Sequence, residues 1–179
     1  MLIEVTVAGL AQDPRTDSPI LLLRDDTNSR ILPIWIGIAE ATAIAAQVEG
    51  IQLPRPMTHD LAQSIVLSLG GRISRVSITS LEDATFYAQI TLVVEEAEHE
   101  VDARPSDAVA LALRAEAPIF VDDAVFKEGS AVVVEASEVE DADLASEAST
   151  GGADAVQQTP AERWNTLLDH LNEDDGGDN

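Results

Sequence analysis

Alternation of apolar and polar residues in the first 35 positions predicts three strands. Apolar and polar residues alternate near the start of the chain and two short apolar runs follow, so the expected strands span 2–10, 19–24 and 30–35. Turn-forming residues fill the two intervals between them, as QDPRTDS and DDTNS. Strands joined by such short turns are expected to pair as an antiparallel meander.

Helical periodicity and helix-ending glycines predict three main helices. The first is rich in alanine and ends at Gly50. The second is capped by Thr58 or Asp60 and ends at Gly70, and the third spans 106–115. The apolar face of the first helix is expected to consist of Ile38, Ala41, Ala45 and Val48.

The middle of the chain alternates again and predicts three further strands joined as hairpins. They span 72–80, 85–95 and 98–103, and a last short strand, IFVDD, follows Pro118. The order is strands, two helices, strands and a helix. This order predicts an α+β fold with a mixed or antiparallel sheet, in one compact domain at 1–130.

The rest of the chain has a different composition and predicts a tail outside that domain. Residues 131–157 are acids, small residues and glycine with almost nothing to bury, so we expect them to be disordered, as we do 174–179. Between these segments, 158–173 predicts one short amphipathic helix that begins with a capping box. Because so short a helix is marginal alone, we expect 160–171 to dock on its own domain, a sister subunit or a protein partner.

Composition excludes several classes of protein. The 179 residues include no cysteine, which excludes disulfides, thiolate catalysis and cysteine-bound zinc. No apolar run approaches the roughly 18 to 20 residues that cross a bilayer, and the N-terminus lacks the features of a signal peptide. We therefore expect an intracellular protein of the cytoplasm with no membrane contact.

The formal net charge of −23 is the most unusual property of the chain. One interpretation is an acidic domain that does not meet polyanions. The other is a halophilic protein adapted to a cytoplasm near molar salt, where the Debye length shrinks to about 3 Å and repulsion weakens. A single lysine among ten basic residues, with acids spread over the whole chain, favours the second interpretation.

Candidate chemistry rests on two Arg-Pro pairs, because the phosphate-binding glycine loop, the nucleophile elbow and the HExxH motif are all missing. The first pair opens the stretch RPMTHD. In a structural interpretation, Thr58 caps a helix and Asp60 complements its dipole. In a functional one, Arg55 and His59, which a cap does not need, form a phosphate site with the free amides of the helix start.

The second pair lies in the stretch DARPSD and also has two interpretations. In the structural one, Arg104 pairs with Asp102 or Asp107 and fixes a strand-to-helix corner. In the functional one, the two aspartates converge with Glu40 or Asp60 and hold a divalent cation, as hydrolysis of phosphodiesters commonly needs. The simpler interpretation of Glu40 by itself is a solvated helix acid.

Four segments together resemble the bifunctional nuclease domain family: LPIWIGIAEATAIA, RPMTHDL, FYAQITL and DARPSDAVALALRAEAPIFV. They occur in this order within 1–127. The resemblance implies a compact α+β domain that self-associates and has RNase and DNase activity. The family-like polar positions are Glu40, Arg55, Thr58, His59, Asp60, Asp102, Arg104, Ser106 and Asp107.

The leading hypothesis is therefore a nuclease that hydrolyses RNA or single-stranded DNA. The predicted catalytic residues are His59, Asp60, Asp102 and Asp107. The predicted phosphate-binding residues are Arg55, Thr58, Arg104 and Ser106. The predicted ligands of Mg²⁺ or Mn²⁺ are Glu40, Asp102 and Asp107. The alternatives are a non-catalytic module that binds a protein partner or a small anion, and a homo-oligomer that only assembles.

Overall fold

The computed structural model describes residues 1–25, 27 and 30–129 of the chain. All of these residues lie in the first of two compact units, which are Met1–Ala136 and Ser137–Asn179. The predicted tail segments 131–157, 158–173 and 174–179 lie outside the described residues, so their disorder and their helix stay predictions.

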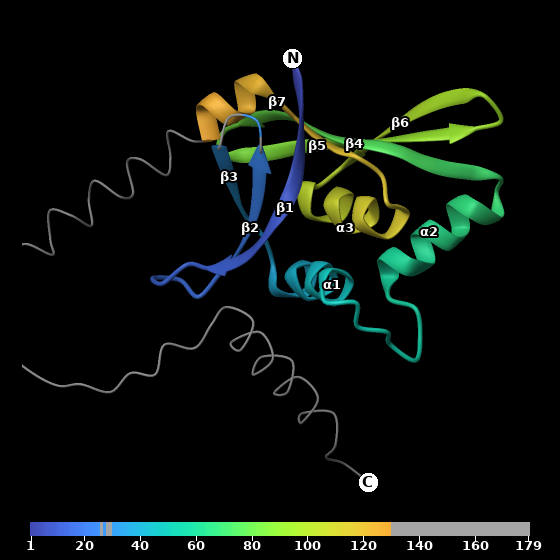
Figure 1. Ribbon diagram of the computed structural model, residues 1–179, viewed down its shortest axis with the longest axis horizontal. Helices are drawn as coiled ribbons and strands as arrows, with labels where there is room; N and C mark the ends of the chain where they lie inside the picture. The colour runs from blue at the N-terminus through green and yellow to red at the C-terminus, as the bar shows by residue number, and fades with distance from the viewer. Residues whose placement is uncertain (26, 28–29, 130–179) are drawn as a thin grey trace, which may run out of the picture. The chain divides into compact units, whose positions relative to one another are not determined.

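In the described part of the chain, seven strands form one sheet in the order β3-β2-β1-β7-β4-β5-β6 (Figure 1). The strands are β1 Leu2–Gln12, β2 Pro19–Asp25, β3 Arg30–Trp35, β4 Gly71–Glu82, β5 Thr85–Val94, β6 Ala97–Ala103 and β7 Ile119–Asp122. The first three form the predicted antiparallel meander, and β4, β5 and β6 form the predicted hairpins. β7 runs antiparallel to β1 and parallel to β4, so the sheet is mixed and the α+β prediction is confirmed.

Three helices lie along one side of the sheet: α1 Ile38–Val48, α2 Thr58–Ser68 and α3 Pro105–Ala115 (Figure 1). α3 packs against β4 and β5 and also contacts the other two helices. A further helical segment at 123–129, which the sequence analysis missed, begins where Asp122 accepts a hydrogen bond from the Ala124 amide. No helix in the described residues is long and apolar enough to cross a membrane.

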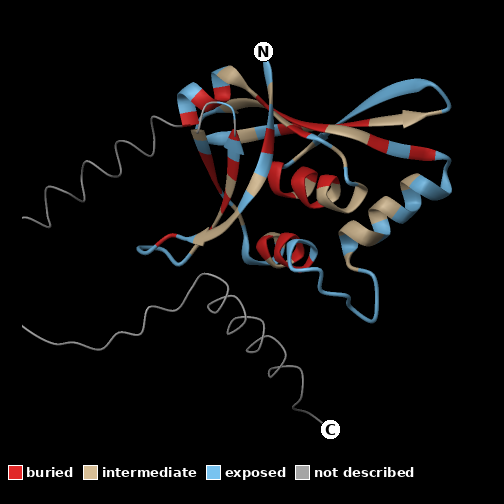
Figure 2. Ribbon diagram, viewed as in Figure 1, coloured by how far each residue is buried: buried red, intermediate tan, exposed pale blue. Residues whose placement is uncertain are grey.

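The core lies around α3, whose small side chains allow close approach to the sheet. Ala108, Val109, Ala110 and Ala112 are fully buried. In Figure 2, buried positions gather on α3, on one side of α1 and along the central strands. By contrast, no residue of α2 is buried. α2 is therefore held to the domain mainly through polar contacts, which build the site described below.

The predicted apolar face of α1 is only half right. Ala41 and Ala45 are buried, but Ile38 and Val48 are 55% and 52% exposed. The large buried side chain is instead Ile44. Because alanine occurs all round this helix, its periodicity does not decide which side faces the core.

Candidate active site

The first turn of α3 carries the central residues of the candidate site. Arg104 is the N-cap with extended backbone angles (φ −71°, ψ 147°), and Pro105 takes the first helical position. The guanidinium then reaches forward, and its Nε and Nη2 donate to Asp107 Oδ2 and Oδ1 at 2.8 and 3.2 Å. Of the two predicted local partners of Arg104, the structure therefore selects Asp107 and not Asp102.

The same guanidinium also binds α1. Nη1 of Arg104 lies 2.7 Å from Oε1 of Glu40, which is in the first turn of that helix. The Glu40 side chain is only 18% exposed, and its carboxylate fills the space in which a Cβ on Gly37 would lie. Glu40 is therefore not a solvated helix acid, and a larger residue at Gly37 would displace its carboxylate.

His59 joins the site from the first turn of α2. Its Nε2 lies 3.1 Å from Oδ1 of Asp107, and its side chain is 14% exposed. Burial raises the pKa of Asp107, but hydrogen bonds from Arg104 and His59 outweigh burial, so the pKa lies below its usual value of 3.8. Asp107 is thus ionised at neutral pH and contacts both Arg104 and His59. We call Glu40, His59, Arg104 and Asp107 the Arg104 cluster.

A second ion pair, which the sequence analysis missed, lies two turns further along α3. Nε of Arg114 donates to Oδ1 of Asp60 on α2. Its Nη1 and Nη2 both donate to the Ala43 carbonyl of α1 at 3.2 Å, and Nη1 also donates to the Ala110 carbonyl at 2.9 Å. The Arg114 side chain is 4% exposed. One buried guanidinium therefore connects all three helices.

The N-terminus of α2 is capped by Asp60 and not by Thr58, the other predicted cap. Met57 is the N-cap residue, and its amide donates to Oδ2 of Asp60 at 2.7 Å. Thr58 is the first helical residue and is exposed. Burial raises the pKa of Asp60, but hydrogen bonds from Arg114 and the Met57 amide outweigh it and lower the pKa below 3.8. Asp60 thus accepts hydrogen bonds from the Met57 amide through one oxygen and from Arg114 through the other.

Arg55, Thr58 and Asp102 lie outside the Arg104 cluster. All three are exposed, and none forms a side-chain hydrogen bond or an ion pair with another residue that the structure describes. Asp102 precedes Ala103 on β6, and Ala103 packs against the core. Because side chains alternate along a strand, Asp102 projects from the opposite face.

The three predicted metal ligands are therefore not brought together. Glu40 and Asp107 face the guanidinium of Arg104, which lies between their carboxylates, and Asp102 lies elsewhere. Across residues 1–25, 27 and 30–129, no group of three or more histidine, aspartate or glutamate side chains is placed to hold a metal ion. The binding of Mg²⁺ or Mn²⁺ stays a prediction.

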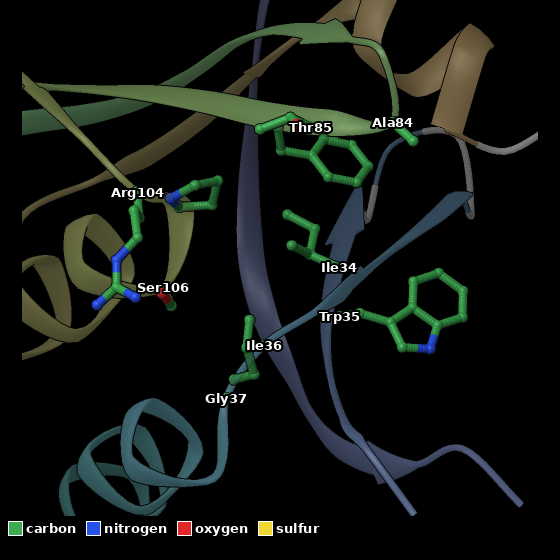
Figure 3. A pocket seen from close by; sticks show the side chains of 10 residues that line it. Ile34, Trp35, Ile36, Gly37, Ala84, Thr85, Arg104 and Ser106 are labelled. Atoms are coloured by element: carbon green, nitrogen blue, oxygen red, sulfur yellow. The ribbon is translucent and has the colours of Figure 1, made fainter. Parts of the chain in front are cut away.

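A pocket of about 280 Å³ lies beside the cluster, between the end of β3, the β4–β5 turn and the start of α3 (Figure 3). Arg104 and Ser106 form its polar wall. Ser106 is 5% exposed as a residue, and its hydroxyl makes no hydrogen bond within the described part of the chain. The apolar walls are formed by Ile34, Ile36, Phe86 and Pro105. Arg104 therefore belongs both to the cluster and to the pocket.

Comparison with known proteins places these residues in a family. A model described as the bifunctional nuclease domain matches residues 21–134. An uncharacterized protein of Mycobacterium tuberculosis is 38% identical over 172 residues, which cover 96% of each chain. Bifunctional nuclease 1 of Oryza sativa subsp. japonica is 26% identical over 114 residues, which are 62% of this chain and 34% of that protein. Bifunctional nuclease 2 of Arabidopsis thaliana is 27% identical over 108 residues, or 59% of this chain and 33% of the plant protein.

Proposed function

The chain belongs to the bifunctional nuclease domain family, and we propose that it hydrolyses phosphodiester bonds of RNA or single-stranded DNA at the Arg104 cluster, in the cytoplasm. The observation that carries this proposal is the contact of 3.1 Å between His59 Nε2 and Asp107 Oδ1. A histidine held by an ionised carboxylate is a common general acid and base. His59 is not needed to cap α2, because Asp60 does so, and α3 has no side-chain cap hydrogen bond that would involve Asp107.

The contact with Asp107 determines what a neutral His59 can do. Nε2–H donates to the carboxylate, which leaves Nδ1 with a lone pair that can accept a proton. In the proposed step, Nδ1 takes a proton from water while the water oxygen forms a bond to phosphorus. The bond from phosphorus to the leaving oxygen breaks, and that oxygen takes up a proton from a second water, while the imidazolium later returns its proton to solvent. Asp107 stabilises the imidazolium that forms.

Arg104 is the proposed phosphate-binding residue of this site. Its side chain is 65% exposed, although three of its nitrogens contact Glu40 and Asp107. A guanidinium has five N–H donors, so about two remain for the substrate phosphate. The start of α3 adds free amides. Arg55 and Thr58, exposed at the start of α2, are proposed to bind phosphates further along the strand.

Self-association is a further part of the proposal, and α2 supports it. Leu61, Ile65 and Leu69 lie on one side of this helix and are 54%, 52% and 72% exposed. A stripe of this kind is commonly covered by another protein surface, and we propose a second copy of the chain. Ile65→Glu should then reduce the molecular mass measured by light scattering during gel filtration. A monomeric wild-type protein would contradict this part of the proposal.

Cleavage assays with a matched histidine pair test the nuclease proposal. Labelled RNA and single-stranded DNA are incubated with wild-type protein, His59→Gln and His99→Gln in molar KCl, with Mg²⁺, with Mn²⁺ and with chelator. His99 is exposed on β6, away from the cluster, and is the control. We expect His59→Gln to lose about 10²- to 10⁴-fold in rate and His99→Gln to keep it.

The outcomes separate the alternatives. Cleavage that survives His59→Gln, or that elutes apart from the protein in gel filtration, contradicts the proposed site. Phosphate or oligonucleotide binding without cleavage under any of these conditions supports the non-catalytic, anion-binding alternative. Activity that chelator abolishes would support the predicted cation, whereas equal activity with chelator would contradict it.

A further inference from the structure

The pocket beside the Arg104 cluster has two chemically different ends. Its far walls are apolar side chains of β3 and β5, among them Ile34 and Phe86. Its near wall is the start of α3, with the Arg104 guanidinium and the Ser106 hydroxyl (Figure 3). At roughly 30 Å³ for each water of the liquid, its volume of about 280 Å³ corresponds to about nine waters. A phosphate alone would contact only the near wall, and water would still occupy the apolar end of the pocket.

Ser106 is the feature that the nuclease proposal does not use fully. It sits in the first turn of α3 but makes no side-chain cap, since the N-cap residue of this helix is Arg104. Ser106 is 5% exposed as a residue, lines the pocket, and makes no side-chain hydrogen bond to any residue in the described ranges. Because no buried side-chain polar atom of the described residues lacks a partner, this hydroxyl is open to the pocket and not sealed in the core. A ligand atom that reaches this wall would form a hydrogen bond with it.

We propose that this pocket holds one unpaired nucleobase of the nucleic-acid chain, with the phosphate of the same nucleotide on Arg104. A base has flat apolar faces and a polar edge, which match the apolar walls and the Ser106 hydroxyl. Stacking of a base on an aromatic side chain is worth about 1–3 kcal/mol, and Phe86 supplies the ring. The inference rests on the proposed function, because it assigns a subsite to the same active site.

Occupation of this pocket selects single strands. A base in a duplex is stacked and paired, and it has to leave the stack before it can enter such a pocket.

Binding measurements test the subsite without cleavage. The His59→Gln protein is titrated calorimetrically with uridine monophosphate, adenosine monophosphate, ribose 5-phosphate and inorganic phosphate, in molar KCl. We expect both nucleotides to bind at least about tenfold more tightly than ribose 5-phosphate, given the stacking contribution. In ¹⁵N NMR spectra, the amides of Gly37, Thr85 and Ser106 should shift with the nucleotides. Equal affinity for all four compounds, or shifts confined to other elements, would overturn the proposal.

Two variants sharpen the test. Ser106→Ala should weaken the binding of both nucleotides about three- to tenfold, because it removes one hydrogen bond. It should leave the affinity for ribose 5-phosphate nearly unchanged. Ser68→Ala, at an exposed position of α2 that does not line the pocket, is the control and should leave all four affinities unchanged. If the wild type cleaves nucleic acid but the nucleotides bind no better than ribose 5-phosphate, the subsite is wrong and the nuclease stands. If the nucleotides bind but nothing is cleaved, the subsite stands and the nuclease is wrong.

Discussion

Asp107 and Arg114 lie seven residues apart on one face of α3, about 10 Å along the helix axis, and each contacts the first turn of α2. Asp107 contacts His59, and Arg114 contacts Asp60, the next residue in the sequence. The two pairs differ in exposure. Arg114 is 4% exposed and joins three helices, whereas Asp107 is 31% exposed and contacts the pocket residue Arg104. We infer that the buried pair of Arg114 and Asp60 stabilises the fold, and that the more exposed pair of Asp107 and His59 takes part in the proposed reaction.

Asp107→Asn should reduce nuclease activity more than stability. The amide keeps the shape of the side chain but loses the charge that orients His59 and stabilises its protonated form. We expect the cleavage rate to fall about 10²- to 10⁴-fold, with a midpoint of urea unfolding close to that of the wild type. The double variant with His59→Gln should be no slower than the slower single variant, because the two residues act as one unit. Fully additive losses would show that they act separately.

Arg114→Met should destabilise the fold. Methionine retains much of the apolar stem but removes every hydrogen bond to Asp60 and to the Ala43 and Ala110 carbonyls. Because Asp60 is 37% exposed and water can reach it, we expect a loss of about 2–3 kcal/mol, below the range for fully buried pairs. Urea unfolding measures this loss. Arg72→Met, at an exposed arginine of β4 with no side-chain hydrogen bond or ion pair to the described residues, is the control.

The sequence was sufficient for the local parts of the fold and insufficient for contacts between distant segments. Alternation and turn residues located the strands of the meander and of the later hairpins. The place of β7 between β1 and β4 depends on pairing across most of the chain, which no local pattern records. Arg114 was missed for the same reason, since Asp60 is 54 residues away. A signal was present, because two charges seven residues apart lie on one face of an otherwise apolar helix.

The candidate site was also predictable only in part. The Arg-Pro corner predicted a contact of Arg104 with a nearby aspartate, and the structure shows it with Asp107, because proline and the helix start fix that turn locally. Asp102 stands in the same motif but projects from the other face of β6, which a prediction of strand alternation could have shown. The link from Arg104 to Glu40 depends on the packing of α1 against α3, and the sequence does not specify it.

The contribution of Asp60 to stability should disappear in acid. Its pKa is lowered below 3.8 in the folded protein, so ionised Asp60 stabilises the fold above that pH and loses its effect as the pH falls through the folded pKa. The difference in unfolding free energy between wild type and Asp60→Asn should therefore be largest near pH 7 and vanish well below pH 3.8. Glu82→Gln, which removes an exposed acid without a partner in the described residues, is the control. A difference that stays constant with pH would contradict the assignment.

Arg30→Met should destabilise the end of the β2–β3 hairpin. Arg30 donates to Asp25, whose side chain is fully buried, and to Asp123, and it stacks 4.5 Å above the centre of the Phe126 ring. Removing it breaks the ion pair of a buried carboxylate, and breaking such a pair costs about 3–5 kcal/mol. Lys127→Met is a matched control, because Lys127 binds the same Asp123 from an exposed position and should contribute little. Equal losses in urea unfolding would show that Asp25 does not need Arg30.

Salt should stabilise the protein through its edge strand. Glu98, Glu100 and Asp102 alternate along β6, so they share one face, and neighbouring acids are about 7 Å apart. Glu100 has an acid on each side, whereas Glu98 lies 3.5 Å from Arg75. Raising KCl from 0.1 M to 1 M shortens the Debye length from about 10 Å to about 3 Å and should increase the wild-type unfolding free energy.

Glu100→Gln isolates this repulsion from the other charges of the chain. We expect the variant to be more stable than the wild type in 0.1 M KCl by a few tenths of a kcal/mol, the size of like-charge neighbour effects. In 1 M KCl the gain should vanish, because screening already removes the repulsion. His99→Gln, on the opposite face of the same strand, should show no such salt dependence. A gain for Glu100→Gln that persists in 1 M KCl would mean that it comes from strand propensity and not from charge.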